Sequence, residues 1–283
     1  MFKRQKSGSV LCRSCGKLVG VHDDVCLNCG QKNPGLWGFA PFLRHLGNDF
    51  GFMPIVIWGC VALYTATLLV DPRGIRMSGI SILAPSTRSL FSFGASGAIP
   101  IFGSGRWWTV LSAAWLHGGL IHIGFNLLWV RQLAPEVAAL YGGARAFIIY
   151  MVASVVGFFL SSFGWLVFSV IPISFLRGAS LTVGASASIF GLLGALVAYG
   201  RRGGSSHISG QAMSYAAIMF IFGFLMPGID NYAHLGGFIG GYVAALLLNP
   251  LKPEQMKHVI AAVLCLVLTA ASILASVLLS ARL

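Results

Sequence analysis

The chain consists of long apolar runs separated by shorter polar segments. After a polar N-terminal stretch come seven apolar segments, several close to the length of about 20 residues that a helix needs to cross a bilayer. The pattern predicts transmembrane helices at about residues 53–70, 119–140, 144–170, 186–201, 213–226, 231–248 and 258–279. The expected fold class is therefore an all-α polytopic membrane protein.

Composition supports this class. Of the 283 residues, 57% are hydrophobic and 9% are charged, whereas a soluble domain carries about 25% charged residues. The net charge of +12 comes from bases scattered over loops. This distribution argues against nucleic-acid binding and favours basic loops on the cytoplasmic side of a membrane. The first residues lack the apolar run expected of a signal peptide.

The basic residues also predict an orientation. They gather in the N-terminal segment and in the loops that follow 186–201 and 231–248. A cytoplasmic N-terminus and an outer C-terminus place all three groups inside. The long loop between the first two apolar segments carries arginines on the outer side, an exception that long loops tolerate. We expect an integral protein that crosses the inner membrane of a prokaryotic cell several times.

Four cysteines form two C-x-x-C pairs in the stretch "CRSCGKLVGVHDDVCLNCG", each followed by glycine. They are Cys12, Cys15, Cys26 and Cys29. Four thiolates at this spacing match a tetrahedral Zn²⁺ site, and the glycines allow a tight turn. The alternatives are a disulfide pair, which needs an oxidising compartment, and His22 as a substitute ligand. We expect a structural zinc-ribbon-like module over residues 1–35, followed by a linker over 36–52.

Polar side chains occur inside the apolar segments, near one predicted membrane surface. They are His122, Asn126, Ser186 and His234. Each alone is most simply a hydrogen-bonding group between helices. The distances of Ser186 from Arg201 and of His234 from Asn249 are fifteen residues each. Fifteen helical residues rise about 22 Å, which leaves both groups about 8 Å below the outer surface.

Polar groups from three helices are therefore expected to meet at one depth. A serine beside a histidine is a nucleophile–base pair, and asparagine and a second histidine can donate to a developing oxyanion. Glycines follow both Ser186 and His234, the latter in "LGGFIGG". Small residues let helices approach closely, so the two helices are expected to touch along their glycine faces.

Three stretches resemble the signatures of rhomboid intramembrane serine proteases. They are "HGGLIHIGFN" (His117 to Asn126), "GASASIFGLLGA" (Gly184 to Ala195) and "NYAHLGGFIGG" (Asn231 to Gly241). The stretch "RWWTVLSAAWLHGG" also resembles the segment that leads into the family's second helix. The resemblance implies a six-helix core over residues 53–250. Residues 251–283 would then add one further transmembrane helix.

The resemblance also implies roles for individual residues. Ser186 would be the nucleophile and His234 its general base, without a catalytic acid. His122, Asn126 and the backbone N–H of Ser186 would form the oxyanion hole.

Other residues near the motifs have implied structural roles. His117 would anchor structure near the site, and Gly184 would permit a tight turn before the nucleophile. Ala187 stands where the family usually has glycine. Asp230 lies four residues before His234, and its simplest role is to cap the helix that carries this histidine.

The expected function is that of a serine endopeptidase cleaving single-span membrane proteins near the outer surface of the lipid bilayer, with no catalytic cofactor. The alternative is a non-proteolytic rhomboid-like scaffold that binds transmembrane helices.

A second serine between small residues, Ser96 in "GASGAIP", lies in a loop rich in Gly, Ser and Pro with no nearby histidine. We therefore expect Ser186, and not Ser96, to be the nucleophile. The pattern specifies no oligomeric state.

Overall fold

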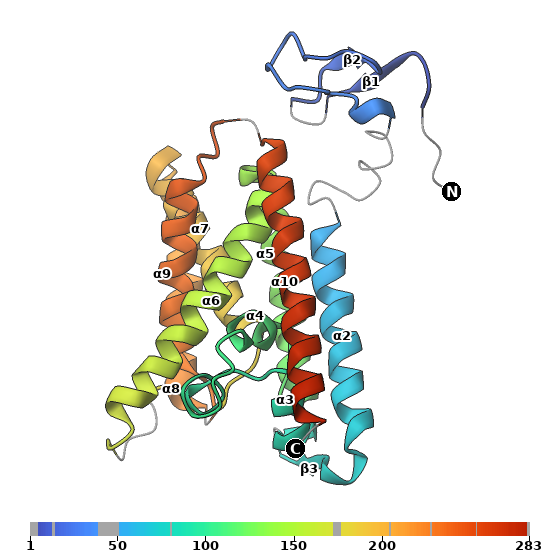
Figure 1. The fold of residues 1–283 in the computed structure, drawn as a ribbon. Coiled ribbons are helices and arrows are strands. Elements are labelled where there is room, and N and C mark those ends of the chain that lie inside the picture. The colour runs from blue at the N-terminus through green and yellow to red at the C-terminus, as the bar shows by residue number, and fades with distance from the viewer. Residues whose placement is uncertain are drawn as a thin grey trace.

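The computed structural model describes residues 5–12, 15–38, 51–79, 81–171, 177–203, 205–226, 228–252 and 254–281. Within these ranges seven long helices form a bundle, which confirms the expected all-α membrane fold (Figure 1). They are α2 (Phe52–Val70), α5 (Leu120–Tyr141), α6 (Gly143–Phe168), α7 (Ser186–Gly203), α8 (Ser206–Leu225), α9 (Asn231–Leu247) and α10 (Met256–Ser280). Each coincides with one of the seven predicted apolar segments.

Not every helix is long and apolar enough to cross a membrane by itself. Among the described residues, α2, α6, α8 and α10 meet that requirement, and α5 does so only with the short Thr109–Trp115 segment, which meets it at 94°. α7 and α9 are only 18 and 17 residues long. α7 is buried along its length from Ala187 to Ala198. By length and composition alone, four or five of the described helices therefore qualify as membrane spans. A helix that is enclosed by other helices, such as α7, does not need an apolar surface that faces lipid.

α7 and α9 pack against each other with almost no side chain between them. A Cβ atom added at Gly237 would lie 2.7 Å from the carbonyl carbon of Ala187, and one at Gly194 would lie 3.0 Å from the backbone nitrogen of Tyr242. Carbon atoms normally pack about 3.5–4.0 Å apart, so only glycine allows this spacing. The predicted contact between the two glycine faces is confirmed.

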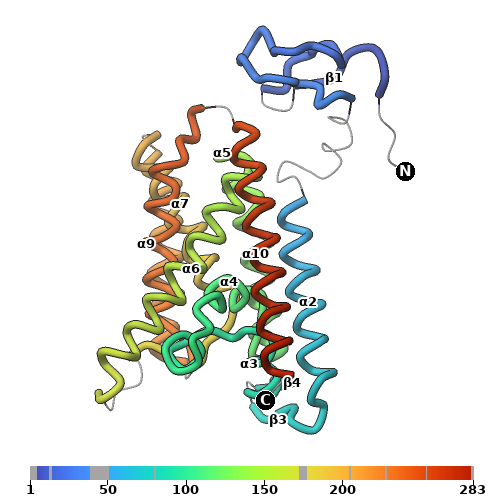
Figure 2. Tube along the Cα trace, in the orientation of Figure 1, coloured from blue at the N-terminus to red at the C-terminus, as the bar shows by residue number. Residues whose placement is uncertain are grey.

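The segment between α2 and α5 folds into a series of short elements, which extend from one end of the bundle, at β3 and β4, to about its mid-height, at α4 (Figure 2). They are η2 (Pro72–Gly74), β3 (Arg76–Ser78), β4 (Ser81–Ala84), α3 (Thr87–Phe93), η3 (Ile99–Gly103), α4 (Thr109–Ser112) and η4 (Ala113–Trp115). β3 and β4 pair antiparallel, and η3 is a π-helical turn. The hydropathy pattern had indicated only a long loop here.

The N-terminal module contains the antiparallel strands β1 (Ser9–Leu11) and β2 (Leu18–Gly20), which pair Val10 with Val19. The 3-10 turn η1 (Leu36–Gly38) follows. Valines, Leu36 and buried cysteines form a small core of their own. Residues 1–4 and 13–14 of the predicted module and residues 39–50 of the predicted linker lie outside the described residues.

Candidate active site

Ser186 is the first residue of α7 and is partly exposed. The preceding turn depends on Gly184, whose φ of +131° lies in a region that side chains disfavour. A Cβ at Gly184 would lie 2.7 Å from Nε2 of His122 and 3.8 Å from Oγ of Ser186. The imidazole of His122 in α5 and the hydroxyl of Ser186 in α7 therefore lie next to the same space. That space is open because residue 184 is a glycine and has no side chain.

His234 lies in the first turn of α9 and is buried. Its ring stacks on Phe190 with centroids 4.2 Å apart and an interplanar angle of 14°. Phe190 is four residues after Ser186, one turn along α7. The stacking therefore holds the imidazole of His234 close to the N-terminal end of α7, where Ser186 is the first residue.

Asp230 caps the helix that carries His234. Its carboxylate accepts from the backbone N–H of Ala233 at 3.0 Å and from the hydroxyl of Ser161 at 2.5 Å, as the sequence had indicated for a cap. Nδ1 of His234 is buried and makes no hydrogen bond to any described residue. Within the described chain, the histidine is therefore held by ring stacking, and no carboxylate orients it.

The remaining predicted residues lie on or just before α5. The backbone N–H of Gly118 donates to Nδ1 of His122 at 3.2 Å, which leaves the proton of the neutral ring on Nε2, the atom beside Gly184. The Asn126 amide nitrogen donates to the carbonyl of His122 at 2.7 Å. His117 is completely buried, and the centroids of its ring and the His122 ring are 5.3 Å apart in an edge-to-face arrangement.

The segment that leads into Ser186 is held by backbone hydrogen bonds. Ser96 and Thr182 form an antiparallel bridge, with N···O distances of 3.1 and 2.7 Å, and Ala98 N–H donates to Ala179 O at 3.0 Å. The hydroxyl of Ser161 accepts from Ala179 N–H at 3.0 Å. Ser96 is fully buried in this bridge, so the G-A-S-G copy lies in a structural contact.

Three of these contacts were missed from the sequence: Phe190 against His234, Ser161 at the Asp230 cap, and the Ser96 bridge. Phe190 and Ser161 stand in apolar stretches and resemble ordinary core residues. The glycine and serine content of residues 94–99 was the only sequence signal of an extended segment there. The pairing itself joins residues more than 80 positions apart, which no local pattern reveals.

Ala187, the departure from the family pattern, is completely buried. A Cβ at Gly157 of α6 would lie 2.8 Å from the Ala187 methyl group. The glycine on α6 therefore provides the room that the methyl group occupies.

The four N-terminal cysteines converge, with all four Sγ atoms within 4.8 Å of one another. Cys12 and Cys29 sulfurs are 3.7 Å apart, and Cys15 and Cys26 sulfurs are 3.6 Å apart. These distances exceed the roughly 2.05 Å of a disulfide and match the edge of about 3.8 Å for a tetrahedron of sulfurs around Zn²⁺. His22 is exposed and its Nε2 lies 2.9 Å from the Lys6 carbonyl, outside this cluster.

The backbone around the cluster repeats itself. Gly16 and Gly30, at positive φ, donate to the carbonyls of Cys12 and Cys26 at 2.9 and 2.8 Å. A hydrogen bond from the Lys17 backbone lowers the pKa of the Cys15 thiol to about 6, whereas burial raises the pKa of the Cys29 thiol to about 12. Of these two cysteines, Cys15 more readily forms the thiolate that binds metal.

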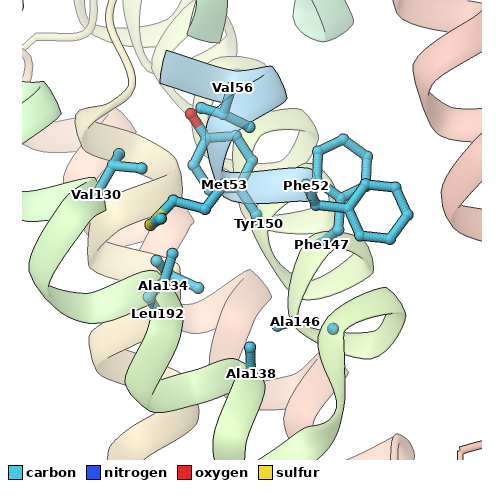
Figure 3. A pocket seen from close by; sticks show the side chains of 11 residues that line it. Phe52, Met53, Val56, Val130, Ala134, Ala138, Ala146, Phe147, Tyr150 and Leu192 are labelled. Carbon is cyan, nitrogen blue, oxygen red and sulfur yellow. The ribbon is translucent and has the colours of Figure 1, made fainter. Parts of the chain in front are cut away.

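A separate pocket lies between α2, α5 and α6 (Figure 3). Phe52 and Met53 from α2 and Phe147 from α6 are among its mostly apolar lining residues. Neither Ser186 nor His234 lines it. The pocket therefore offers packing space and no part of the polar site.

Ser186, His234 and Asn126 bring polar side chains from α7, α9 and α5 into an apolar helical bundle. These features define the class: a polytopic membrane protein with polar side chains among its helices. The chain belongs to the rhomboid family, because the rhomboid domain matches residues 104–251. The match includes α5 to α9 and stops before α10.

Curated relatives agree with the family. The chain is 33% identical over 187 residues to Rhomboid protease GluP of Bacillus subtilis (strain 168), covering 65% of this chain and 34% of that protein. It is 30% identical over 172 residues to RHOMBOID-like protein 7 of Arabidopsis thaliana, covering 59% and 51%. Inactive RHOMBOID-like protein 8 of Arabidopsis thaliana is 28% identical over 163 residues, covering 56% and 43%. The chain thus spans about a third to a half of the length of these relatives.

Proposed function

We propose that this chain is an intramembrane serine protease with Ser186 as nucleophile and His234 as general base. The observation that carries the proposal is the meeting of α7 and α9 on their glycine faces, with Phe190 stacked on His234 one turn beyond Ser186. The similarity to a relative named as a rhomboid protease supports it.

The chemistry follows from these positions. Ser186 Oγ adds to the scissile carbonyl carbon while the imidazole of His234 takes the hydroxyl proton. The C–N bond then breaks, and His234 returns the proton to the departing amine. Water adds to the acyl group by the same route and frees Ser186, which releases a carboxylic acid product.

The oxyanion formed in each addition needs hydrogen-bond donors. Because Gly118 donates to Nδ1 of His122, the neutral ring carries a donor on Nε2 beside Gly184. The N–H of Ser186 is among the first N–H groups of α7, which have no acceptor within the helix. The Asn126 amide nitrogen carries two N–H donors and uses one on the His122 carbonyl, so the other would supply a third donor. Together these groups form the proposed oxyanion hole.

The proposed substrates are single-span membrane proteins with small or helix-breaking residues near the cut, since a peptide in a regular helix hides its carbonyl. With a cytoplasmic N-terminus, as the basic residues indicate, cleavage takes place near the outer surface of the inner membrane.

We also propose Zn²⁺ as the metal of the N-terminal cluster, because four thiolates in tetrahedral spacing suit zinc. Zinc would hold this small module together and take no part in cleavage.

Labelling with a fluorophosphonate probe, together with cleavage of a single-span reporter in liposomes, tests the proposal. The wild-type chain should be labelled and should cleave. Ser186→Ala should lose both activities, and His234→Ala should lose cleavage, because the two residues act as a unit. Ser96→Ala should keep both.

Full activity in Ser186→Ala or His234→Ala would contradict the assignment. The alternative, a scaffold that binds transmembrane helices without cutting them, predicts that the wild-type chain binds the reporter but is neither labelled nor able to cleave it.

A further inference from the structure

The C-terminal half of α10 carries three serines spaced by four residues, Ser272, Ser276 and Ser280. This spacing aligns them along one side of the helix. Ser272 and Ser276 are buried, and α10 lies beside α3 and α4 (Figure 1). The serines therefore face the short elements between α2 and α5. The serines themselves lie outside residues 104–251, which match the rhomboid domain.

Each serine makes a hydrogen bond to that segment. The Ser272 hydroxyl donates to the Trp108 carbonyl at 2.8 Å. The Trp108 indole N–H donates to Ser276 Oγ at 3.1 Å. The Arg106 guanidinium, which is buried and lies 4.5 Å from the Phe91 ring centroid, donates to Ser280 Oγ at 2.8 Å.

The contacts continue from this segment toward the proposed nucleophile. Ser272 Oγ lies 3.1 Å from Ser112 Oγ, and the Ser112 hydroxyl donates to the Gly94 carbonyl at 2.7 Å. Two residues beyond Gly94, Ser96 forms its bridge with Thr182. Thr182 is four residues before Ser186.

The segment between α3 and α5 has little structure of its own. α4 is four residues long and η3 is five, too short to be stable without tertiary contacts. It also contains buried polar groups, which must be hydrogen-bonded to be stable away from water. α10 supplies the partners for Trp108 and Arg106.

We propose that α10 is a positioning element for the site, whose serines hold residues 94–112 and, through the Ser96–Thr182 bridge, fix the backbone that presents Ser186. The proposal rests on the proposed function for its catalytic consequence. The anchoring itself can be measured without activity.

The test uses the full chain in detergent and the single variants Ser272→Ala and Ser276→Ala. The matched control is Thr269→Val, which removes a buried hydroxyl of α10 whose one hydrogen bond among the described residues is to the Cys265 carbonyl of the same helix. The first readout is backbone hydrogen exchange at Ser96 and Thr182. The second is the rate of fluorophosphonate labelling, together with the KM and kcat for a reporter.

Both serine variants should exchange faster than wild type at these two amides, and Thr269→Val should not. Labelling and kcat should fall about 10-fold or more, since small displacements of reacting groups are costly, while KM changes little. Trp108→Phe removes the donor to Ser276, so combining it with Ser276→Ala should add little to either single change.

Unchanged exchange in both serine variants would overturn the proposal, as would faster exchange with wild-type labelling. If even the wild-type chain is not labelled, the proposed function has failed, and the exchange data still decide whether α10 anchors the segment.

Discussion

Replacing Gly237 with alanine should separate the two helices that carry the proposed nucleophile and base. The added Cβ would lie 2.7 Å from the carbonyl carbon and 2.9 Å from the Cα of Ala187. Carbon atoms pack at about 3.5–4.0 Å, so α9 must move away from α7 by about 1 Å. The obstructing atoms belong to the backbone of α7, which cannot turn aside as a flexible side chain could.

Two magnitudes follow. Overpacking of this kind typically costs about 1–3 kcal/mol of stability, which a folded membrane bundle can tolerate. A displacement of about 1 Å between reacting groups can reduce the rate about 100-fold. We therefore expect Gly237→Ala to fold with a lower Tm and to cleave a reporter about 100-fold more slowly than wild type.

The assay compares cleavage of a single-span reporter in liposomes with the Tm of the same preparation. Gly210→Ala in α8 is the control, because a Cβ there meets no atom within 4 Å. The control should cleave at the wild-type rate. If Gly237→Ala matched Gly210→Ala in both Tm and rate, the close approach of α7 and α9 could not be what sets the geometry.

Three further predictions concern single residues. Asn126→Ala should lower kcat by on the order of 10²-fold with little change in KM, as for a donor used only in the transition state; normal kcat with a lower Tm would make Asn126 a structural residue. Cys12→Ser should reduce the bound zinc from one ion per chain without abolishing cleavage, and undiminished zinc by metal analysis would contradict the cluster. Asp230→Asn keeps an acceptor for the Ala233 N–H, so Tm and cleavage should both persist; loss of cleavage at an unchanged Tm would show that the carboxylate itself is needed.

The lipid-facing helices could be predicted well from the sequence. α10 was expected at 258–279 and occupies Met256–Ser280, because its long apolar run has only one interpretation. α8 was expected from residue 213 but begins at Ser206, capped by Ser205. Its first two turns are too polar for a hydropathy pattern to include them, although they continue the same helix.

The candidate site was only partly predictable. Ser186 and His234 could be selected because polar groups are unusual in apolar helices. Their surroundings depend on contacts between distant parts of the chain, such as the Ser96–Thr182 bridge and the hydrogen bonds from α10 to Trp108. Hydrophobic periodicity describes one element at a time, so it carries no information about these pairings.

The enclosure of α7 also bears on the bilayer itself. Only 22%, 17% and 22% of the most apolar stretches of α2, α8 and α10 are buried within the protein, so these helices respond to membrane thickness by tilting or by deforming the nearby lipid. α7 is buried from Ala187 to Ala198 and follows the surrounding protein instead. On the proposed topology, the depth of Ser186 below the lipid headgroups is therefore expected to change with bilayer thickness, and a thicker bilayer should lengthen the path of water to the proposed site.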